Sequence, residues 1–108
     1  MTSEALLEAL VGVLVQIQSL IPRDKQAWAD DEMLRLALER LWITAGNLAE
    51  AYRLAADVPS GVEPWSELYG FRSVLAHALP GDIAPDRMWH ETTVALPRLL
   101  SAVQSAGS

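Results

Sequence analysis

The amino-acid sequence predicts an all-α protein that folds as an up-down four-helix bundle. Apolar residues recur in steps of three and four over long segments, and no segment shows the alternation expected of a strand. Two of the helical segments open on a proline, at Pro64 and at Pro85, where the first turn of a helix accepts it. The chain has 108 residues, so residues 1–108 are expected to form a single domain.

The first helix is expected to begin at Thr2 or Ser3, either of which can cap it, and to end before Pro22. Its apolar residues form one stripe with a second flank, which is typical of a helix buried on more than one side. The stripe is Leu6, Leu10, Val13, Leu14, Ile17, Leu20 and Ile21, and the flank is Leu7, Val11 and Val15. The uncharged run 9–21 has 13 residues. Because a bilayer core is about 30 Å thick, this run predicts a buried helix and not a membrane span.

The second helix is expected to begin at the acidic run 30–32 and to reach Ala55, with the most sustained periodicity in the chain. Its apolar positions are Leu34, Leu38, Leu41, Ala45, Leu48, Tyr52 and Ala55. Helix propensity disfavours Gly46 in the middle of this segment. That glycine is either tolerated or used for the close approach of another helix.

The third helix is expected to run from Trp65 to about Ala78 and to stop at the Pro80–Gly81 pair. The last helix is expected to begin at Pro85 and to present Trp89, Leu96, Leu99, Leu100 and Val103 inward. Pro97 lies inside this helix and should kink or loosen it, because the hydrogen bond to the carbonyl of Thr93 is lost.

Composition excludes several kinds of chemistry. The chain has no cysteine and only two histidines, without H-E-x-x-H or comparable spacing, so no disulfide, metal site or cofactor is predicted. A cytoplasmic location is expected. The formal net charge of −6 argues against non-specific binding to DNA or RNA. Chemistry on RNA would need a locally positive cleft.

The pair Arg72 and His77 is the first candidate for chemistry. Five residues on a helix correspond to about 140° of rotation, so these side chains do not share a face. A shared site would need the helix to end between them, a long arginine reaching around, or two copies meeting across a two-fold axis. The second apolar flank of the first helix and the tryptophans at 28, 42, 65 and 89 could supply such an interface between helix faces. Alternatively, both residues help to satisfy the free carbonyls at the helix end.

Four ordered features carry a resemblance to a known family. Gly46 stands 19 residues before Trp65, and the Pro-Trp pair opens a helix that leads to R-x-x-x-x-H, from Arg72 to His77. The stretch "GDIAPDRMW" then supplies an acidic residue and a short loop ending in Trp89, and "ALPRLL" gives a leucine-proline step in the last helix. With these features, residues 46–100 resemble the HepT-like branch of the HEPN superfamily.

The resemblance implies a metal-independent endoribonuclease, the toxin of a toxin–antitoxin pair, which acts as a homodimer and is neutralised by a nucleotidyltransferase-type antitoxin. His77 would be the general base or acid on the ribose 2′-hydroxyl or the leaving 5′-oxygen, a role that suits histidine at neutral pH. Arg72 would hold the scissile phosphate and stabilise its developing charge. Ser73 would orient either group, and Asn47, where many relatives have a glutamate, would hydrogen-bond Arg72 or the RNA.

One residue departs from the family pattern. Many relatives carry a tyrosine two residues after the histidine, which the antitoxin modifies with AMP, and here that residue is Leu79. Tyr69 and Tyr52 are alternative hydroxyl groups, and nothing in the sequence favours either. A second hypothesis follows from Leu79 and the acidic charge: a non-catalytic helical module that binds a nucleotidyltransferase-fold partner. A plain dimeric bundle that binds a nucleotide is a third.

Overall fold

The computed structural model describes residues 1–79 and 85–107, and their regular structure is entirely helical. The helices are α1 (Ser3–Ser19), α2 (Lys25–Ala29), α3 (Glu32–Ala55), α4 (Trp65–His77), α5 (Pro85–His90), the π-helical turn η1 (Glu91–Ala95) and α6 (Leu96–Ala106). The all-α prediction is therefore confirmed for the described part of the chain. Within these ranges, none of the helices combines the length and the apolar character needed to cross a membrane.

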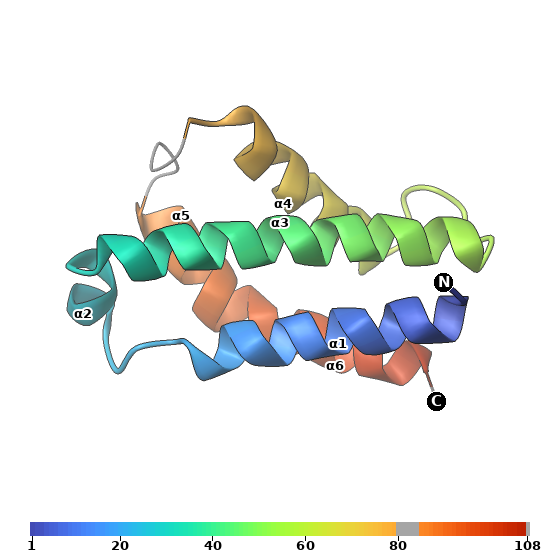
Figure 1. The fold of residues 1–108 in the computed structure, drawn as a ribbon, viewed down its shortest axis with the longest axis horizontal. Helices are drawn as coiled ribbons and strands as arrows, with labels where there is room; N and C mark the ends of the chain where they lie inside the picture. The colour runs from blue at the N-terminus through green and yellow to red at the C-terminus, as the bar shows by residue number, and fades with distance from the viewer. Residues whose placement is uncertain (80–84, 108) are drawn as a thin grey trace.

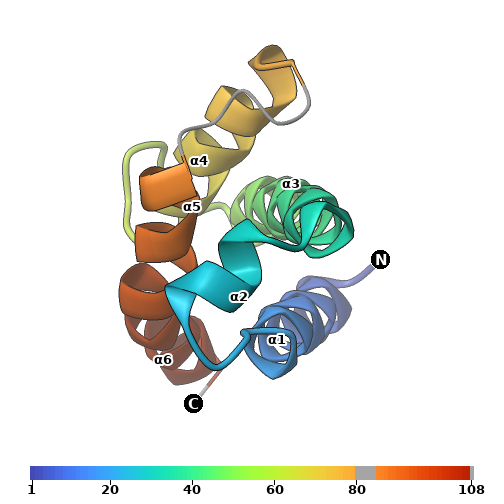
Figure 2. The same cartoon turned by 90° about the vertical axis from the view of Figure 1, so that its left-hand side faces the viewer.

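The longer helices alternate in direction along the long axis of the molecule (Figure 1). Helices α1 and α3 lie side by side and antiparallel, α4 packs on the other side of α3, and α6 packs against α1. An end-on view shows α1, α3, α4 and the α5–α6 segment arranged around a shared interior (Figure 2).

The long helices begin close to the predicted residues because polar side chains cap them. The Thr2 hydroxyl accepts a hydrogen bond from the Ala5 backbone N–H at 3.1 Å. A carboxylate oxygen of Asp31 accepts one from the Leu34 N–H at 3.0 Å. Helix α4 ends at His77, and the predicted stop at 80–81 lies outside the described residues.

The short helix α2 was not predicted. It has five residues, too few for a periodic pattern, and the Asp24 side chain caps it by accepting from the Ala27 N–H at 2.9 Å. Its buried residue is Trp28, which is 1% exposed and anchors the connection between α1 and α3 to the core.

The last helical segment is loosened next to Pro97, as the sequence predicts. The five residues of η1 form a π-helical turn, and the Leu96 N–H donates to the carbonyl of Glu91, five residues back. Proline cannot donate to the carbonyl four residues earlier, and a π-turn is one way in which a helix accommodates the lost bond.

Three of the four tryptophans belong to the core of the single chain. Trp28, Trp42 and Trp65 are each less than 5% exposed. The Trp42 indole N–H donates to the hydroxyl of buried Thr92 at 3.1 Å, which joins α3 to η1. The expectation that these three side chains supply a subunit interface is therefore wrong, because packing within the chain already covers them. Only Trp89 remains half-buried.

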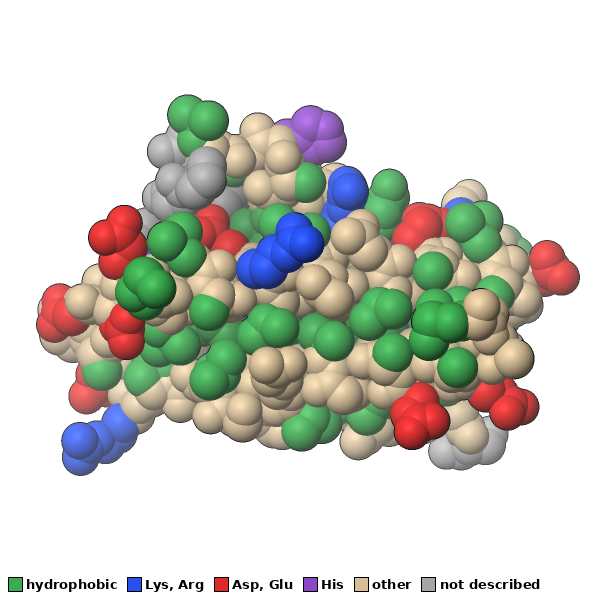
Figure 3. All heavy atoms as spheres, viewed as in Figure 1, with side chains coloured by type: hydrophobic (Ala, Val, Ile, Leu, Met, Phe, Trp, Pro, Cys, Tyr) green, Lys and Arg blue, Asp and Glu red, His purple; other side chains and the backbone are tan. Residues whose placement is uncertain are grey.

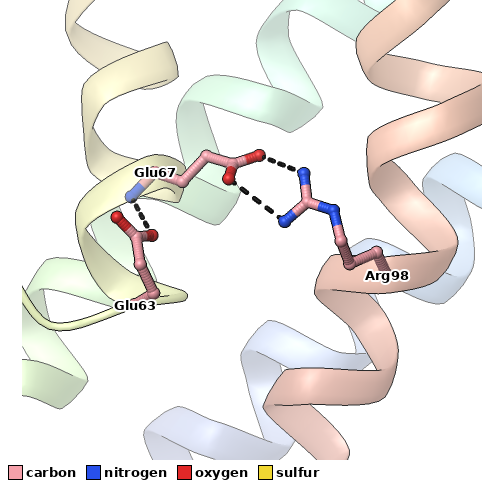
Figure 4. Close-up of polar contacts among 3 residues, drawn as sticks. All are labelled: Glu63, Glu67 and Arg98. Carbon is pink, nitrogen blue, oxygen red and sulfur yellow. Dashed lines mark hydrogen bonds and ion pairs between the residues drawn. The ribbon is translucent and has the colours of Figure 1, made fainter.

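Carboxylates hold the start of α4 in place (Figure 4). Oε2 of Glu63 accepts a hydrogen bond from the Glu67 N–H at 3.0 Å, which satisfies a free donor of the first turn. The two oxygens of Glu67 accept from Nη1 and Nη2 of Arg98 at 3.1 and 2.8 Å. This paired contact links α4 to α6 and fixes the helix that carries the R-x-x-x-x-H motif.

Candidate functional site

Helices α3 and α4 are in tight contact at Gly46. A Cβ atom built on this buried glycine would lie 2.7 Å from the carbonyl oxygen of Leu68 and 2.8 Å from Cγ of Arg72. No side chain fits there, so the glycine serves the close approach of another helix. The consequence is that Arg72 lies directly against α3.

Arg72 is anchored through one of its three guanidinium nitrogens. Its Nε donates to Oδ1 of Asn47 at 2.7 Å, and its guanidinium carbon lies 5.5 Å from the centre of the Tyr69 ring. Nη1 and Nη2 make no hydrogen bond or ion pair within the described residues. The arginine is thus held in one position while its terminal nitrogens stay available to an anion.

His77 is exposed at the C-terminal end of α4. Its Nδ1 lies 2.7 Å from the carbonyl oxygen of Ser73. A carbonyl only accepts, so the neutral ring must carry its proton on Nδ1 and its lone pair on Nε2. The contact is one that a helix-end histidine makes with a nearby carbonyl, and it also leaves Nε2 free to exchange a proton.

Ser73 contributes its carbonyl and not its hydroxyl. The Ser73 Oγ donates to the carbonyl of Tyr69, one turn earlier, at 3.0 Å. The expectation that the serine side chain orients Arg72 or His77 is therefore not met in this arrangement. What orients the histidine ring is the serine backbone.

Arg72 and His77 are on different sides of α4. The helix continues without a break from Trp65 to His77, so it does not end between them. Arg72 is directed to Asn47 on α3 and does not reach around to the histidine. Of the four predicted site residues, the structure brings Arg72 together with Asn47, and His77 together with the backbone of Ser73. It does not join the two pairs.

Charge is unevenly distributed over the surface. On the face drawn in Figure 3, cationic side chains and a histidine lie over the middle of α3 and α4, a further cationic side chain projects at the lower left-hand end, and acidic side chains lie mainly toward the two ends of the molecule. A hollow of about 200 Å³ lies between the same helices, and its lining carries both an acidic and a basic side chain: Leu36, Glu39, Arg40, Ile43, Leu75 and Ala78. In the described part of the chain, no group of three or more His, Asp or Glu side chains is arranged to hold a metal ion.

Among the other candidate residues in the sequence, Tyr69 takes part in this arrangement, and Leu79, Tyr52 and His90 do not. Leu79 is 71% exposed. Tyr52 packs against Trp65 in a tilted arrangement with ring centres 4.5 Å apart, and His90 is exposed at the end of α5. The contact of Tyr69 with Arg72 was not predicted, although its spacing of three residues on a helix is a signal that would have revealed it.

Comparison of the chain with protein-family models, with curated proteins and with solved structures gave no match.

Proposed function

We propose that the chain is a metal-independent endoribonuclease that acts as a homodimer of up-down four-helix bundles. One observation carries the proposal: Arg72 is fixed through Nε with Nη1 and Nη2 unpaired, while the His77 ring is fixed through Nδ1 with Nε2 free. Each residue thus has one nitrogen held by the protein and another available to substrate. This is the arrangement that phosphate binding and proton transfer require.

A second copy completes the site. The two motif residues of one α4 face different directions, and a two-fold axis beside α4 would bring the Arg72 and His77 of both copies to one cleft. His77 is exposed and Arg72 is half-buried, so both can reach a shared substrate.

The reaction follows from these roles. Nε2 of one His77 takes the proton of the ribose 2′-hydroxyl, and the 2′-oxygen attacks the adjacent phosphorus. The bond from phosphorus to the 5′-oxygen breaks, and that oxygen receives the Nε2 proton of the other His77, which enters the reaction as the doubly protonated imidazolium and leaves it as the neutral ring. Arg72 stabilises the charge on the phosphate oxygens through Nη1 and Nη2. The products are a 2′,3′-cyclic phosphate and a 5′-hydroxyl.

In the cell, the proposed enzyme is a cytoplasmic toxin neutralised by a nucleotidyltransferase-type antitoxin. Leu79 stands where many members of the similar family carry the modified tyrosine, and its side chain has no hydroxyl to accept AMP. The antitoxin would therefore act by binding and not by modification at this position.

The test is RNA cleavage by purified protein in the presence of a chelator. We expect cyclic phosphate ends, and a loss of about 10²–10⁴-fold in rate for His77→Ala, the usual contribution of a general acid or base. Arg72→Ala should lose about 10²–10³-fold, as expected for one group that stabilises transition-state charge. His90→Ala is the matched control, because this histidine is also exposed but lies outside the motif. Unchanged cleavage by His77→Ala protein would exclude the assignment.

A non-catalytic module that binds a nucleotidyltransferase-fold partner is the second candidate. The net charge of −6 and the exposed Leu79 favour it. In that case the wild type leaves RNA intact, and Arg72→Ala and His77→Ala both retain partner binding. Expression toxicity of the wild type, compared with His77→Ala, separates the two candidates in cells.

A further inference from the structure

A second hollow lies at the opposite end of α4 from His77. Its volume is about 380 Å³, within the range of small-molecule sites, about 300–1,000 Å³. Its lining residues belong to the last part of α3, the loop that follows and the first part of α4, and these segments meet toward the right-hand end of Figure 1. Its lining consists of Glu50 and its ion-pair partner Arg53 of α3, Ser60 and Gly61 of the loop, and Trp65, Ser66, Tyr69 and Gly70 of α4.

Gly70 lines this hollow without a side chain. It lies inside α4, where glycine is among the least favourable residues for a helix. A Cβ built on Gly70 would meet nothing within 4 Å, so no close helix contact in the chain explains the glycine, in contrast to Gly46. Its missing side chain leaves space over Ser66, one turn earlier on the same face of α4.

The lining presents an aromatic surface together with unused polar atoms. Tyr69 as a whole residue is 36% exposed. The hydroxyls of Ser60 and Ser66 make no hydrogen bond within the described residues. Both contacts of Glu50 with Arg53 use Oε1, which leaves Oε2 to accept from another donor. An aromatic ring with nearby hydroxyls and a free carboxylate oxygen matches the flat face and polar edge of a nucleobase.

We infer that this hollow binds a nucleobase that carries an exocyclic amino group, from the nucleotide next to the scissile phosphate. The inference rests on the proposed function, because Tyr69 lines the hollow and also contacts Arg72, the proposed phosphate ligand. From Gly70 to His77 is seven residues, or about 10 Å along the helix axis. A carboxylate acceptor favours guanine, adenine or cytosine over uracil, which has no amino group.

Binding of uncleavable 2′-deoxydinucleotides that differ in one base tests the inference without requiring cleavage. We expect wild-type protein to prefer amino-bearing bases over thymine. Gly70→Leu should weaken that binding about tenfold, since base stacking is lost, and should abolish the base preference. Gly12→Leu is the matched control, because an added Cβ at this exposed α1 glycine also meets nothing within 4 Å. Ser66→Ala, which removes one hydroxyl, should weaken the preference even if Gly70→Leu folds poorly by circular dichroism.

The outcomes separate the inference from the proposed function. Base-selective binding that Gly70→Leu abolishes, with no RNA cleavage, supports the nucleobase site and excludes the ribonuclease. If the wild type cleaves RNA, and Gly70→Leu and Ser66→Ala keep the affinity and base preference of the wild type, the nucleobase site is excluded. The proposed ribonuclease function is then unaffected. If Gly70→Leu instead dissociates a dimer while the affinity of each protomer is unchanged, the face is an interface between copies and the inference is wrong.

Discussion

The surroundings of Glu91 in the folded chain favour the neutral form of its carboxyl group. Its Oε2 is buried and has no hydrogen-bond partner within the described residues. Burial is the main reason that the pKa of this carboxyl is raised, and the nearby carboxylate of Glu67 adds to the effect. Arg87, His90 and Arg98 act in the opposite direction but do not cancel it. The group lies in η1, the turn that Pro97 loosens.

The raised pKa of Glu91 predicts a pH dependence of stability. Between the ordinary pKa of a glutamate and the raised value, the folded chain binds more protons than the unfolded chain, so the contribution of Glu91 to stability falls as pH rises. Glu91→Gln cannot ionise and should therefore raise the melting temperature at pH 7 relative to wild type, with less difference at pH 4. Thermal unfolding followed by circular dichroism measures this.

Glu8→Gln is the control, because Glu8 is an exposed carboxyl on α1. Its substitution should change the melting temperature little at either pH. A Glu91→Gln protein that is less stable than wild type at pH 7 would show that the ionised carboxylate is a favourable partner of Arg87 and Arg98.

The contact between α3 and α4 depends on the absence of one side chain. An alanine at position 46 would favour the helix by about 1 kcal/mol through propensity alone. Its Cβ would nevertheless meet the carbonyl of Leu68 at 2.7 Å and the side chain of Arg72, so the helices must separate. We expect Gly46→Ala to lower the free energy of unfolding by about 1–3 kcal/mol, the usual effect of overpacking. The same separation should reduce any activity that depends on Arg72.

Gly12→Ala is the matched control for this prediction. Gly12 is exposed in α1 with nothing within 4 Å of an added Cβ, so alanine should stabilise the chain by up to about 1 kcal/mol. Urea unfolding of both variants measures the change in the free energy of unfolding, which should have opposite signs in the two variants. A Gly46→Ala protein that is more stable than wild type would mean that α4 can move away from α3 without loss of stability.

Sequence patterns predict helices well when they are long and periodic. The repeat from Leu34 to Ala55 spans many turns, and capping residues mark its start, so α3 was predicted within two residues. Helix α2 was not predicted, because its five residues are too few to show the helical repeat of apolar residues. The sequence also did not predict whether three of the tryptophans lie in the core or at a subunit interface. An apolar side chain fits both places equally well, and only packing decides between them.

The candidate site was predictable only in part, for a similar reason. The spacing of Arg72 and His77 correctly indicates that they face different directions. The hydrogen bond from Arg72 to Asn47 is one of the two roles that the family resemblance implies for Asn47, and the structure contains it. It spans 25 residues and two helices, so no local pattern in the sequence determines it. Gly46 was the one sequence signal that the two helices approach at this level, because a buried mid-helix glycine commonly marks close contact.

Over the whole molecule, few cations are available to bind a polyanion. The chain has eight Lys and Arg residues and 14 Asp and Glu residues, which gives its formal net charge of −6. Lys25, Arg53 and Arg98 are in ion pairs with Asp86, Glu50 and Glu67. In the proposed site the phosphate contacts are assigned to Arg72 of each copy, while the acidic surface of the dimer repels RNA.

This distribution predicts a shallow dependence of RNA affinity on salt. Each phosphate contact on a single strand contributes about −0.7 to the slope of log K against log salt concentration, so two copies of Arg72 should give about −1.4. Repulsion from the acidic surface makes the slope shallower still, because salt screens it. Arg72→Gln should bring the slope close to zero, whereas Arg23→Gln, an exposed cation between α1 and α2, should leave it unchanged. Titrations with an RNA that carries a 2′-deoxy residue at the cleavage site measure the slope. A value of about −5 or steeper would require more phosphate contacts than two arginines provide, and the proposed cleft would then be too small.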